Sequence, residues 1–288
     1  MEKYYRFAGV TLAIDIPDDK MYLEDRHLGK FCENSVIEPD LFQIRITEYL
    51  DEPEGDCLLA EHGFHIYRAG ETVIRYIGAT KDLWGNGYCR VSRCGKFHDV
   101  QLKTENFPER IGVKTVLGAL GAEHLVVRAG GVILHASYIV HEGRAILFTA
   151  PSETGKSTQA ELWRELRGAK IVNGDRAAMR MEDGAIMACG IPFAGSSQYC
   201  ENVTAPLAAI VCLGQAPQTT IRPLRGYPAF RRIWEGCSVN TWDQTDVEMA
   251  TSLVQKILET VPVFQLDCTP DESAVIALEE KLREQVNQ

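Results

Sequence analysis

Hydrophobic and polar residues alternate in short runs through the first hundred residues of the chain. Alternation with a period of two puts hydrophobic side chains on one face of a strand, and the Gly, Pro, Asp and Asn residues between the runs favour turns. The predicted strands are residues 10–16, 42–47, 64–67, 72–77 and 88–92. Residues 67–72 have the composition of a hairpin connection, which favours antiparallel pairing. We expect residues 1–104 to form a β-rich domain that serves substrate recognition or assembly.

The pattern changes after residue 104. Hydrophobic positions within residues 113–126 suit a buried helix, so the domain boundary is predicted within residues 104–112 and the second domain at 105–288. Strands then alternate with helices, which predicts an α/β or α+β fold. The predicted strands are residues 131–140, 145–149, 170–173, 207–213 and 263–266, and the predicted helices are residues 158–166, 227–234, 247–260 and 271–286. Gly168 is expected to end the first of these helices.

The segment Ala150–Ser157 lies between a predicted strand and a predicted helix and reads Ala-Pro-Ser-Glu-Thr-Gly-Lys-Ser. This is the pattern of a phosphate-binding loop (P-loop, or Walker A motif), whose backbone N–H groups surround a polyphosphate at a helix N-terminus. Lys156 is expected to reach the β- and γ-phosphates of ATP, and Ser157 to hold Mg²⁺. The predicted nucleotide-binding residues are Ser152, Glu153, Thr154, Gly155, Lys156, Ser157 and Thr158.

One residue of the loop departs from its usual composition. Glu153 occupies a position where many phosphate loops have a glycine, which can adopt a positive φ and leaves the phosphate path free of side chains. A carboxylate at this position either points away from the anion or weakens ATP binding.

The segment after the loop helix brings a carboxylate toward the phosphates. Only a short turn separates that helix from residues 170–173, so we expect these residues to form a strand of the same sheet, with its carboxyl end beside the phosphate loop. Asp175 follows this strand. A carboxylate there can bind Mg²⁺ or accept the proton of an attacking hydroxyl. The alternative is a plain turn residue, because Gly-Asp is common in turns.

Composition narrows the classes of function. The 288 residues are 45% hydrophobic, which is enough for a core. No segment is apolar over the roughly 18 residues that span a bilayer, and the first residues lack the apolar stretch of a signal peptide. Nine cysteines are scattered without a C-x2-C pair, and His62 and His65 near Cys57 lack the spacing of a metal site. A net charge of -10 disfavours nucleic acid. We therefore expect a cytoplasmic protein with reduced thiols that binds neither membrane nor nucleic acid.

Three segments together resemble the catalytic domain of the HPr serine kinase/phosphorylase family. They are His135–Ser137, residues 146–158 and residues 171–176. The fold of that family is related to ATP-dependent phosphoenolpyruvate carboxykinase, and the family includes kinases associated with peptide biosynthesis. The resemblance covers residues 113–288. It implies a catalytic core in which a P-loop is inserted into a β-rich nucleotide-binding fold, preceded here by the β-rich N-terminal domain.

The resemblance also implies roles for individual residues. It places His135 close to the transferred phosphate and makes Asp175 the base or a metal ligand. The family usually has an Asp-Asp pair where this chain has Gly174-Asp175, so one metal-binding or base function is expected to be missing. The segment that marks recognition of the HPr protein is not evident. Without the resemblance, His135 in an apolar strand is more typical of a hydrogen-bonded core histidine.

Two further segments offer candidate contacts. Residues 192–198 are rich in small and hydroxylated side chains, as in a substrate or phosphate contact or in an ordinary loop. Arg231 and Arg232 are candidates to stabilise the charge of a transferring phosphoryl group, although solvated arginines on a helix are common.

The sequence predicts an ATP-dependent, Mg²⁺-requiring kinase that phosphorylates a hydroxyl group, with Asp175, His135 and Lys156 as catalytic residues and Ser157 and Asp175 as metal ligands. The acceptor, whether a protein serine, a peptide or a small molecule, stays open, as does self-association into a homo-oligomer. A small-metabolite kinase of the gluconate or adenylylsulfate kinase type is an alternative, but those enzymes have the loop at the start of the chain. A non-catalytic nucleotide-binding sensor is a second alternative, which Glu153 and Gly174 motivate.

Overall fold

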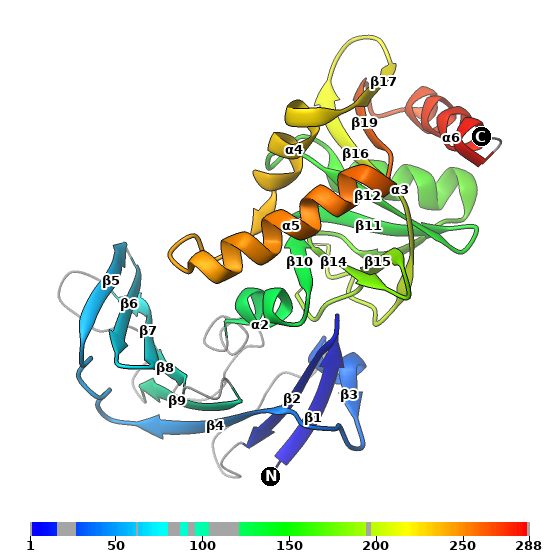
Figure 1. Ribbon diagram of the computed structural model, residues 1–288. Helices are drawn as coiled ribbons and strands as arrows, with labels where there is room; N and C mark the ends of the chain where they lie inside the picture. The colour runs from blue at the N-terminus through cyan, green and yellow to red at the C-terminus, as the bar shows by residue number, and fades with distance from the viewer. Residues whose placement is uncertain are drawn as a thin grey trace. The chain divides into compact units, whose positions relative to one another are not determined.

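A computed structural model describes residues 2–15, 27–61, 63–79, 87–91, 96–103, 121–193 and 197–286 (Figure 1). The chain divides into two compact units, the first made of residues 1–6 and 10–122 and the second of residues 7–9 and 123–288. The boundary predicted within residues 104–112 lies outside the described residues and stays a prediction. Most of the helix predicted at 113–126 lies outside them too, and the described helix there is α2, Ala122–Arg128.

The first unit contains a nine-stranded sheet with the strand order β3-β1-β2-β4-β9-β8-β7-β6-β5. Its strands are β1 (Glu2–Phe7), β2 (Val10–Asp15), β3 (Cys32–Glu33), β4 (Asp40–Thr47), β5 (Asp56–Glu61), β6 (Gly63–Ala69), β7 (Thr72–Ala79), β8 (Gly87–Val91) and β9 (Phe97–Lys103), and a 3-10 helix spans Leu28–Phe31. The β6–β7 hairpin is confirmed, since Ala69 pairs with Thr72 and Gly70 has a φ of 58°.

The expectation of antiparallel pairing holds for only part of this sheet. Strands β5 to β9 form antiparallel neighbours, but β4 pairs in parallel with both β2 and β9. Parallel neighbours need a long connection rather than a hairpin. Strands β5 to β8 lie between β4 and β9 along the chain. A prediction that pairs each strand with the next one in the sequence therefore missed the pairing of β4 with β9.

The second unit is built on a ten-stranded sheet with the order β13-β11-β12-β16-β15-β14-β10-β18, in which β19 pairs with β16 and β17 with β19. Its strands are β10 (Gly131–Leu134), β11 (Ala136–His141), β12 (Arg144–Thr149), β13 (Lys170–Asn173), β14 (Ala177–Glu182), β15 (Ala185–Cys189), β16 (Thr204–Gln215), β17 (Thr220–Leu224), β18 (Cys237–Ser238) and β19 (Val263–Cys268). Its longer helices are α3 (Lys156–Arg167), α4 (Gly226–Trp234), α5 (Gln244–Thr260) and α6 (Glu272–Val286).

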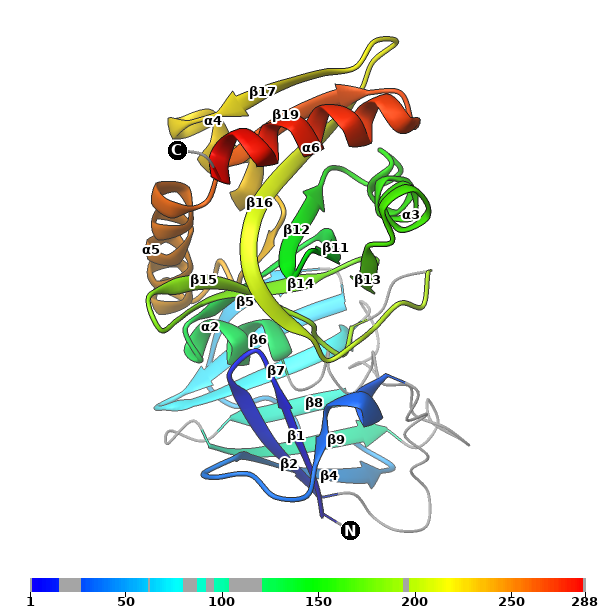
Figure 2. The same ribbon diagram turned by 90° about the vertical axis from the view of Figure 1, so that its right-hand side faces the viewer.

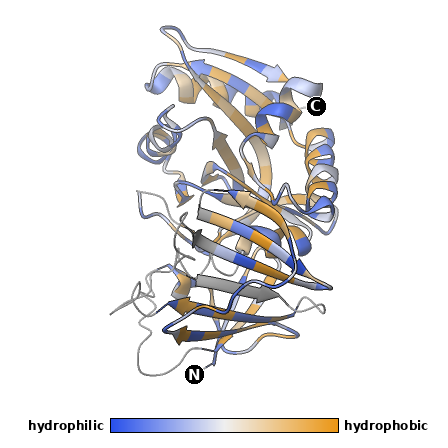
Figure 3. Cartoon of the chain, turned by 90° about the vertical axis from the view of Figure 1, so that its left-hand side faces the viewer, coloured by the Kyte–Doolittle hydropathy of each residue, from blue (hydrophilic) through white to orange (hydrophobic). Residues whose placement is uncertain are grey.

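Helices cover both faces of the strands around β12 and β16 (Figures 1 and 2). On one face, Ile233 of α4 and Leu253 of α5 pack in a buried cluster with residues of the sheet. On the other face, Trp163 of α3 and Leu278 of α6 pack in a second cluster. The strands are therefore hydrophobic on both sides, whereas the covering helices show hydrophobic and hydrophilic residues in turn (Figure 3). The mixed α/β architecture agrees with the predicted fold class.

The single strand predicted at 131–140 is wrong. The chain breaks at His135, so that β10 pairs with β14 and β18 while β11 pairs with β12 and β13. The backbone N–H of His135 donates to the Gly236 carbonyl (2.8 Å), and its own carbonyl accepts a hydrogen bond from the Thr149 hydroxyl (3.0 Å). Strands β10 and β11 are both buried, so hydrophobic residues continue on both sides of His135. Hydrophobic periodicity alone therefore does not reveal the break.

The β14–β15 hairpin, β17 and the short strand β18 were not predicted. The hairpin turns at Asp183 and Gly184, which both have positive φ (48° and 82°), as a two-residue type I′ turn requires. Asp-Gly between two short runs is a hairpin signal that the sequence does contain. The other strands and helices predicted for this unit are present, with ends shifted by a few residues.

Residues 170–173 form a strand of the same sheet, as predicted, and its carboxyl end lies at the predicted edge. Strand β13 pairs antiparallel with β11, and β11 pairs antiparallel with β12. Strands β12 and β13 therefore run in the same direction with β11 between them, and their carboxyl ends lie at the same edge of the sheet. The chain leaves β12 into the predicted phosphate loop and leaves β13 toward Asp175 at this edge.

Candidate active site

The predicted phosphate loop connects the end of β12 to the start of α3. Gly155 is the N-cap residue of α3 with a φ of 111°, a conformation that L side chains rarely adopt. The N–H of Gln159 donates to the Gly155 carbonyl (2.9 Å), and the first N–H groups of any α-helix have no partner within the helix. They carry the positive end of the helix dipole. Gly168, with a φ of 65°, ends the helix as predicted.

Glu153 adopts the left-handed conformation that a glycine would adopt without strain. Its φ is 62°, and its side chain is exposed. The backbone is held from β16, because the Gln215 side-chain amide donates to the Glu153 carbonyl (3.5 Å). The left-handed region costs an L residue about 1–2 kcal/mol. The backbone at Glu153 therefore has a conformation that a glycine would adopt more easily, and the glutamate is strained there.

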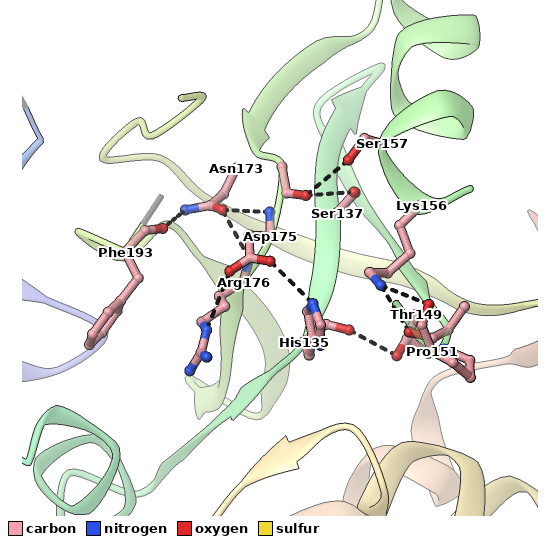
Figure 4. Close-up of polar contacts among 12 residues, drawn as sticks. His135, Ser137, Thr149, Pro151, Lys156, Ser157, Asn173, Asp175, Arg176 and Phe193 are labelled. Atoms are coloured by element: carbon pink, nitrogen blue, oxygen red, sulfur yellow. Dashed lines mark hydrogen bonds and ion pairs between the residues drawn. The ribbon is translucent and has the colours of Figure 1, made fainter. Parts of the chain in front are cut away.

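Lys156 lies folded over the loop (Figure 4). It is only 7% exposed, and its Nζ donates to the carbonyls of Ala150 (2.9 Å) and Pro151 (3.2 Å). Burial lowers the pKa of Lys156, and the negative charge of Asp175 opposes that effect. The ammonium group is thus held at the loop and close enough to Asp175 to feel its charge.

His135, between β10 and β11, contacts Asp175, which follows β13 (Figure 4). The distance from His135 Nε2 to Asp175 Oδ1 is 3.1 Å, and Arg176 Nε lies 3.4 Å from the other carboxylate oxygen. A carboxylate only accepts hydrogen bonds, so we assign the imidazole proton to Nε2 and leave Nδ1 as an acceptor. Burial lowers the pKa of His135, as do the charges of Lys156 and Arg176, whereas Asp175 raises it. The imidazole is therefore neutral at pH 7.

Asn173 fixes the backbone that carries Asp175, and the sequence analysis missed it. Its side chain is fully buried at the end of β13. Its Oδ1 accepts from the N–H groups of Asp175 (2.9 Å) and Arg176 (3.0 Å), and its Nδ2 donates to the carbonyls of Ile191 (3.3 Å) and Phe193 (2.6 Å). Asn is a residue that forms such turns with its own following backbone, so Asn-Gly-Asp was the available signal.

Gly174 is hydrogen-bonded to both β11 and the start of α3. Its carbonyl accepts hydrogen bonds from Ser137 (3.0 Å) and Ser157 (3.4 Å). A Cβ at this position would lie 2.0 Å from Ser197 Oγ and 3.0 Å from Ser197 Cβ. An aspartate before Asp175 would therefore require Ser197 to move, which gives a physical reason for Gly-Asp in this chain.

A cavity of about 250 Å³ opens beside the loop. It is lined by His135, Thr149, Ala150, Pro151, Cys212, Arg232, Glu235 and Gly236. Of the two candidate arginines, Arg232 lines this cavity, whereas Arg231 is more exposed and pairs with Glu235 (2.7 Å). The structure thus brings Arg232 into the same cavity as His135 and the loop.

The remaining candidates lie as follows. Ser152, Glu153 and Thr158 are exposed, and the Thr154 hydroxyl donates to the Ser152 carbonyl (3.5 Å). In residues 192–198, positions 194–196 lie outside the described residues. His62 also lies outside them, while Cys57 and His65 lie on the paired strands β5 and β6. None of the described helices is long and apolar enough to cross a membrane.

One group in the described chain has metal-ligand spacing that the sequence did not suggest. His124, Asp243 and Asp246 bring ligand atoms within 4.8 Å of one another. Asp246 is fully buried and already bonds to His124 (2.7 Å), Arg128 (3.3 Å) and Asn240 (3.1 Å). A guanidinium therefore balances its charge, and the group connects α2 to the start of α5.

Comparisons with known proteins show little similarity. No protein-family model matches the sequence, and no curated protein matches it. Among solved structures, the chain is similar to the structure of the Hpr(Ser) kinase/phosphatase from Coxiella burnetii, with a TM-score of 0.31 and 13% sequence identity. The match covers 53% of this chain and 95% of that chain. The similarity to that family is remote and weak.

Proposed function

We propose that this chain is an ATP-dependent phosphotransferase that acts on a hydroxyl group. The observation that carries the proposal is the convergence of Lys156 and the loop at the end of β12 with Asp175 at the end of β13. Phosphoryl transfer requires groups that position the phosphates and a group that takes the proton of the acceptor or orients the metal. Lys156 and the N-terminal N–H groups of α3 supply the first, and Asp175 supplies the second.

The donor atoms near the loop suit Mg²⁺. The Ser157 hydroxyl bonds to Gly174, the residue directly before Asp175, so a hydroxyl and a carboxylate oxygen are available from the two sides of the site. Mg²⁺ prefers oxygen ligands and usually takes one or two from the protein. When bound with ATP it would neutralise phosphate charge. Ser157 and Asp175 are the residues that would hold it.

His135 and Arg176 position the proposed base. The neutral imidazole donates its Nε2 proton to Asp175 Oδ1, and Arg176 lies at the other oxygen. These contacts hold the carboxylate in one orientation while Asn173 holds its backbone. In the proposed reaction Asp175 accepts the proton of the acceptor hydroxyl, and the charge of Lys156 stabilises the transferred phosphoryl group.

The division into a recognition or assembly domain at 1–104 and a catalytic domain at 105–288 belongs to this proposal. The separate nine-stranded sheet supports it. We also place the enzyme in the cytoplasm, where its described cysteines, all free, would stay reduced.

A nucleotide-binding sensor is the second candidate, favoured by two observations. Glu153 strains the loop, and Ser197 fills the space that a carboxylate at position 174 would need. A sensor needs the loop and Lys156 but not Asp175.

The test begins with ATP binding. Lys156→Ala should abolish most of the increase in melting temperature that Mg·ATP produces, because the loop loses its fixed charge. Lys170→Ala, which removes an exposed lysine from the start of β13, should behave as wild type. Equal shifts in all three proteins would refute the nucleotide site.

The second step asks for transfer. The protein is incubated with labelled Mg·ATP and an extract of its host, and the phosphorylated product is identified by mass spectrometry. A phosphorylated hydroxyl that appears with wild type and disappears with Asp175→Asn supports the kinase. ATP binding without any product would leave the sensor as the better description.

A further inference from the structure

A row of side chains runs across four strands from the end of the loop strand. Thr149 of β12 pairs with Cys212 of β16, Cys212 pairs with Gln265 of β19, and Gln265 pairs with Arg222 of β17. Residues that pair across strands point to the same face of a sheet. Cys212 belongs to the cluster packed against α4 and α5, so this row faces α4. The face of the sheet that begins at the phosphate loop thus continues to Arg222.

Helix α4 and the Arg222 end of this row line a second, open cavity, of about 440 Å³. Its polar lining is Arg222, Arg231, Arg232, Glu235, Gln265 and Asp267. Arg232 and Glu235 line both this cavity and the one of about 250 Å³ beside His135 and the loop. The two cavities therefore adjoin at Arg232 and Glu235.

The charges of the second cavity are incompletely balanced. Glu235 is paired with Arg231 (2.7 Å), and Asp267 Oδ1 accepts from the Gln265 side-chain amide (2.7 Å). Asp267 is also pressed against β16, since a Cβ on Gly214 would lie 2.1 Å from its Oδ1. Neither Arg222 nor Arg232 has a hydrogen bond or an ion pair within the described part of the chain. Two guanidinium groups without acidic partners thus line one cavity of a protein whose net charge is -10.

Arginines in this situation bind anions. A guanidinium offers several N–H donors in a plane that matches the oxygens of a carboxylate or a phosphate. Neighbouring strands lie about 4.8 Å apart, so the row from Thr149 to Arg222 spans about 14 Å. That length leaves room for a molecule whose anionic group is several bonds away from the end near the loop.

We propose that these adjoining cavities bind the phosphate acceptor, and that the acceptor carries an anionic group, a carboxylate or a phosphate, which Arg232 and Arg222 contact. The inference depends on the proposed kinase function. The acceptor hydroxyl would lie in the smaller cavity near His135, and the anionic group in the larger one. Arg232 and Arg222 are then specificity-determining residues that act on the acceptor rather than on ATP.

The test measures anion binding in a protein whose loop is disabled. Full-length Lys156→Ala is titrated by calorimetry with two probes, inorganic phosphate and succinate. At least one should bind. Arg222→Gln with Arg232→Gln in the same background should weaken that binding about tenfold or more, since hydrogen bonds to charged groups are lost. Arg144→Gln, at the other end of β12, removes one positive charge from an exposed residue and should have no effect; it is the matched control for the single variant Arg222→Gln.

The probe that binds more tightly identifies the anionic group as phosphate or carboxylate. If the double variant unfolds, Arg222→Gln alone is used, because this residue is exposed. It should weaken binding of the probe by a smaller factor. The inference is overturned if neither probe binds, or if binding is equally strong without the arginines. ATP binding by the wild type is measured separately, so that failure of the nucleotide site and failure of the anion site are distinguishable.

Discussion

Each of the two units contains a His–Asp pair of nearly the same length. His98 Nε2 lies 3.2 Å from Asp40 Oδ1 in the nine-stranded sheet, and His135 Nε2 lies 3.1 Å from Asp175 Oδ1 beside the phosphate loop. Their surroundings differ. The His98 side chain is 1% exposed, and its ring stacks on Phe42 with centroids 4.0 Å apart. The side chains of His135 and Asp175 are 37% and 32% exposed.

Two His–Asp pairs of similar length can therefore have different surroundings, and the surroundings decide which pair we assign to catalysis. His98 and its neighbour Phe42 face each other across two parallel strands, and Asp40 begins one of them, so that pair fastens the sheet. His135 lies at a break between strands and Asp175 lies after a strand end, where both are accessible. Lys156 and Arg176 add positive charge around the second pair. We expect the exposure of His135 and the nearby positive charge to let the second pair act in phosphoryl transfer.

The largest expected effect is a difference in the rate of phosphoryl transfer between variants of the two His–Asp pairs. Asp175→Asn keeps the size of the side chain and removes its charge, so phosphoryl transfer should fall by a factor on the order of 100 or more, the usual contribution of a general base. Asp40→Asn should leave the rate unchanged. The rates are compared at saturating Mg²⁺, where an aspartate that only recruits metal would be partly rescued. Equal rates for Asp175→Asn and wild type would reduce Asp175 to a turn residue.

The second prediction is that substitution in the His98–Asp40 pair lowers stability more than substitution in the His135–Asp175 pair. His98→Ala removes a buried, stacked ring and should lower the free energy of unfolding by about 2 kcal/mol, as core truncations do. His135→Ala should cost much less, because its side chain is already more than one third exposed. Urea denaturation measures both. A greater loss of stability from His135→Ala would show that the two pairs have been assigned the wrong roles.

The third prediction compares a glutamate with a positive φ from each unit. Glu153 has a φ of 62° in the loop, and Glu38 has a φ of 46° and pairs with Lys96 (2.8 Å). Glu153→Gly should relieve strain and stabilise the protein by about 1 kcal/mol at most. It should also tighten ATP binding, because one negative charge is removed from the loop. Glu38→Gly loses its surface ion pair together with the strain, so neither stability nor ATP affinity should change much. Weaker ATP binding by Glu153→Gly would contradict this account.

The smallest effect is a pair of opposite changes in the titration of His135. Asp175 raises the pKa of His135 and Lys156 lowers it. Asp175→Asn should therefore move this pKa further below its ordinary value of 6.5, and Lys156→Ala should move it upward. NMR titration of the imidazole resonances measures both. In the wild type the neutral form dominates at pH 7, and transfer should decline as the pH falls through this lowered pKa. Two shifts of the same sign would refute the arrangement of charges.

The local features of the site could be predicted from the sequence because they depend on neighbouring residues. The strand, the loop and the helix around Ala150–Ser157 follow from a hydrophobic run, a glycine before Lys-Ser and a helix-forming stretch. The position of Asp175 followed from the short connection between α3 and β13, although β11 rather than β12 is the neighbour of β13. Short-range pattern is sufficient where the chain itself links the parts.

Contacts between distant segments were decided only by the tertiary structure. The break at His135 is set by bonds to Gly236 and Thr149, and Asn173 acts through carbonyls about twenty residues away. Ser197 occupies the space beside Gly174, and Arg222 meets Arg232 around one cavity because β17 pairs with β19 while α4 covers that face. Hydrophobic periodicity records which side of an element is buried, whereas it does not record which distant element covers it. The sequence therefore determined the strand, the loop and the helix around Lys156 and the position of Asp175, and packing of distant elements determined what surrounds them.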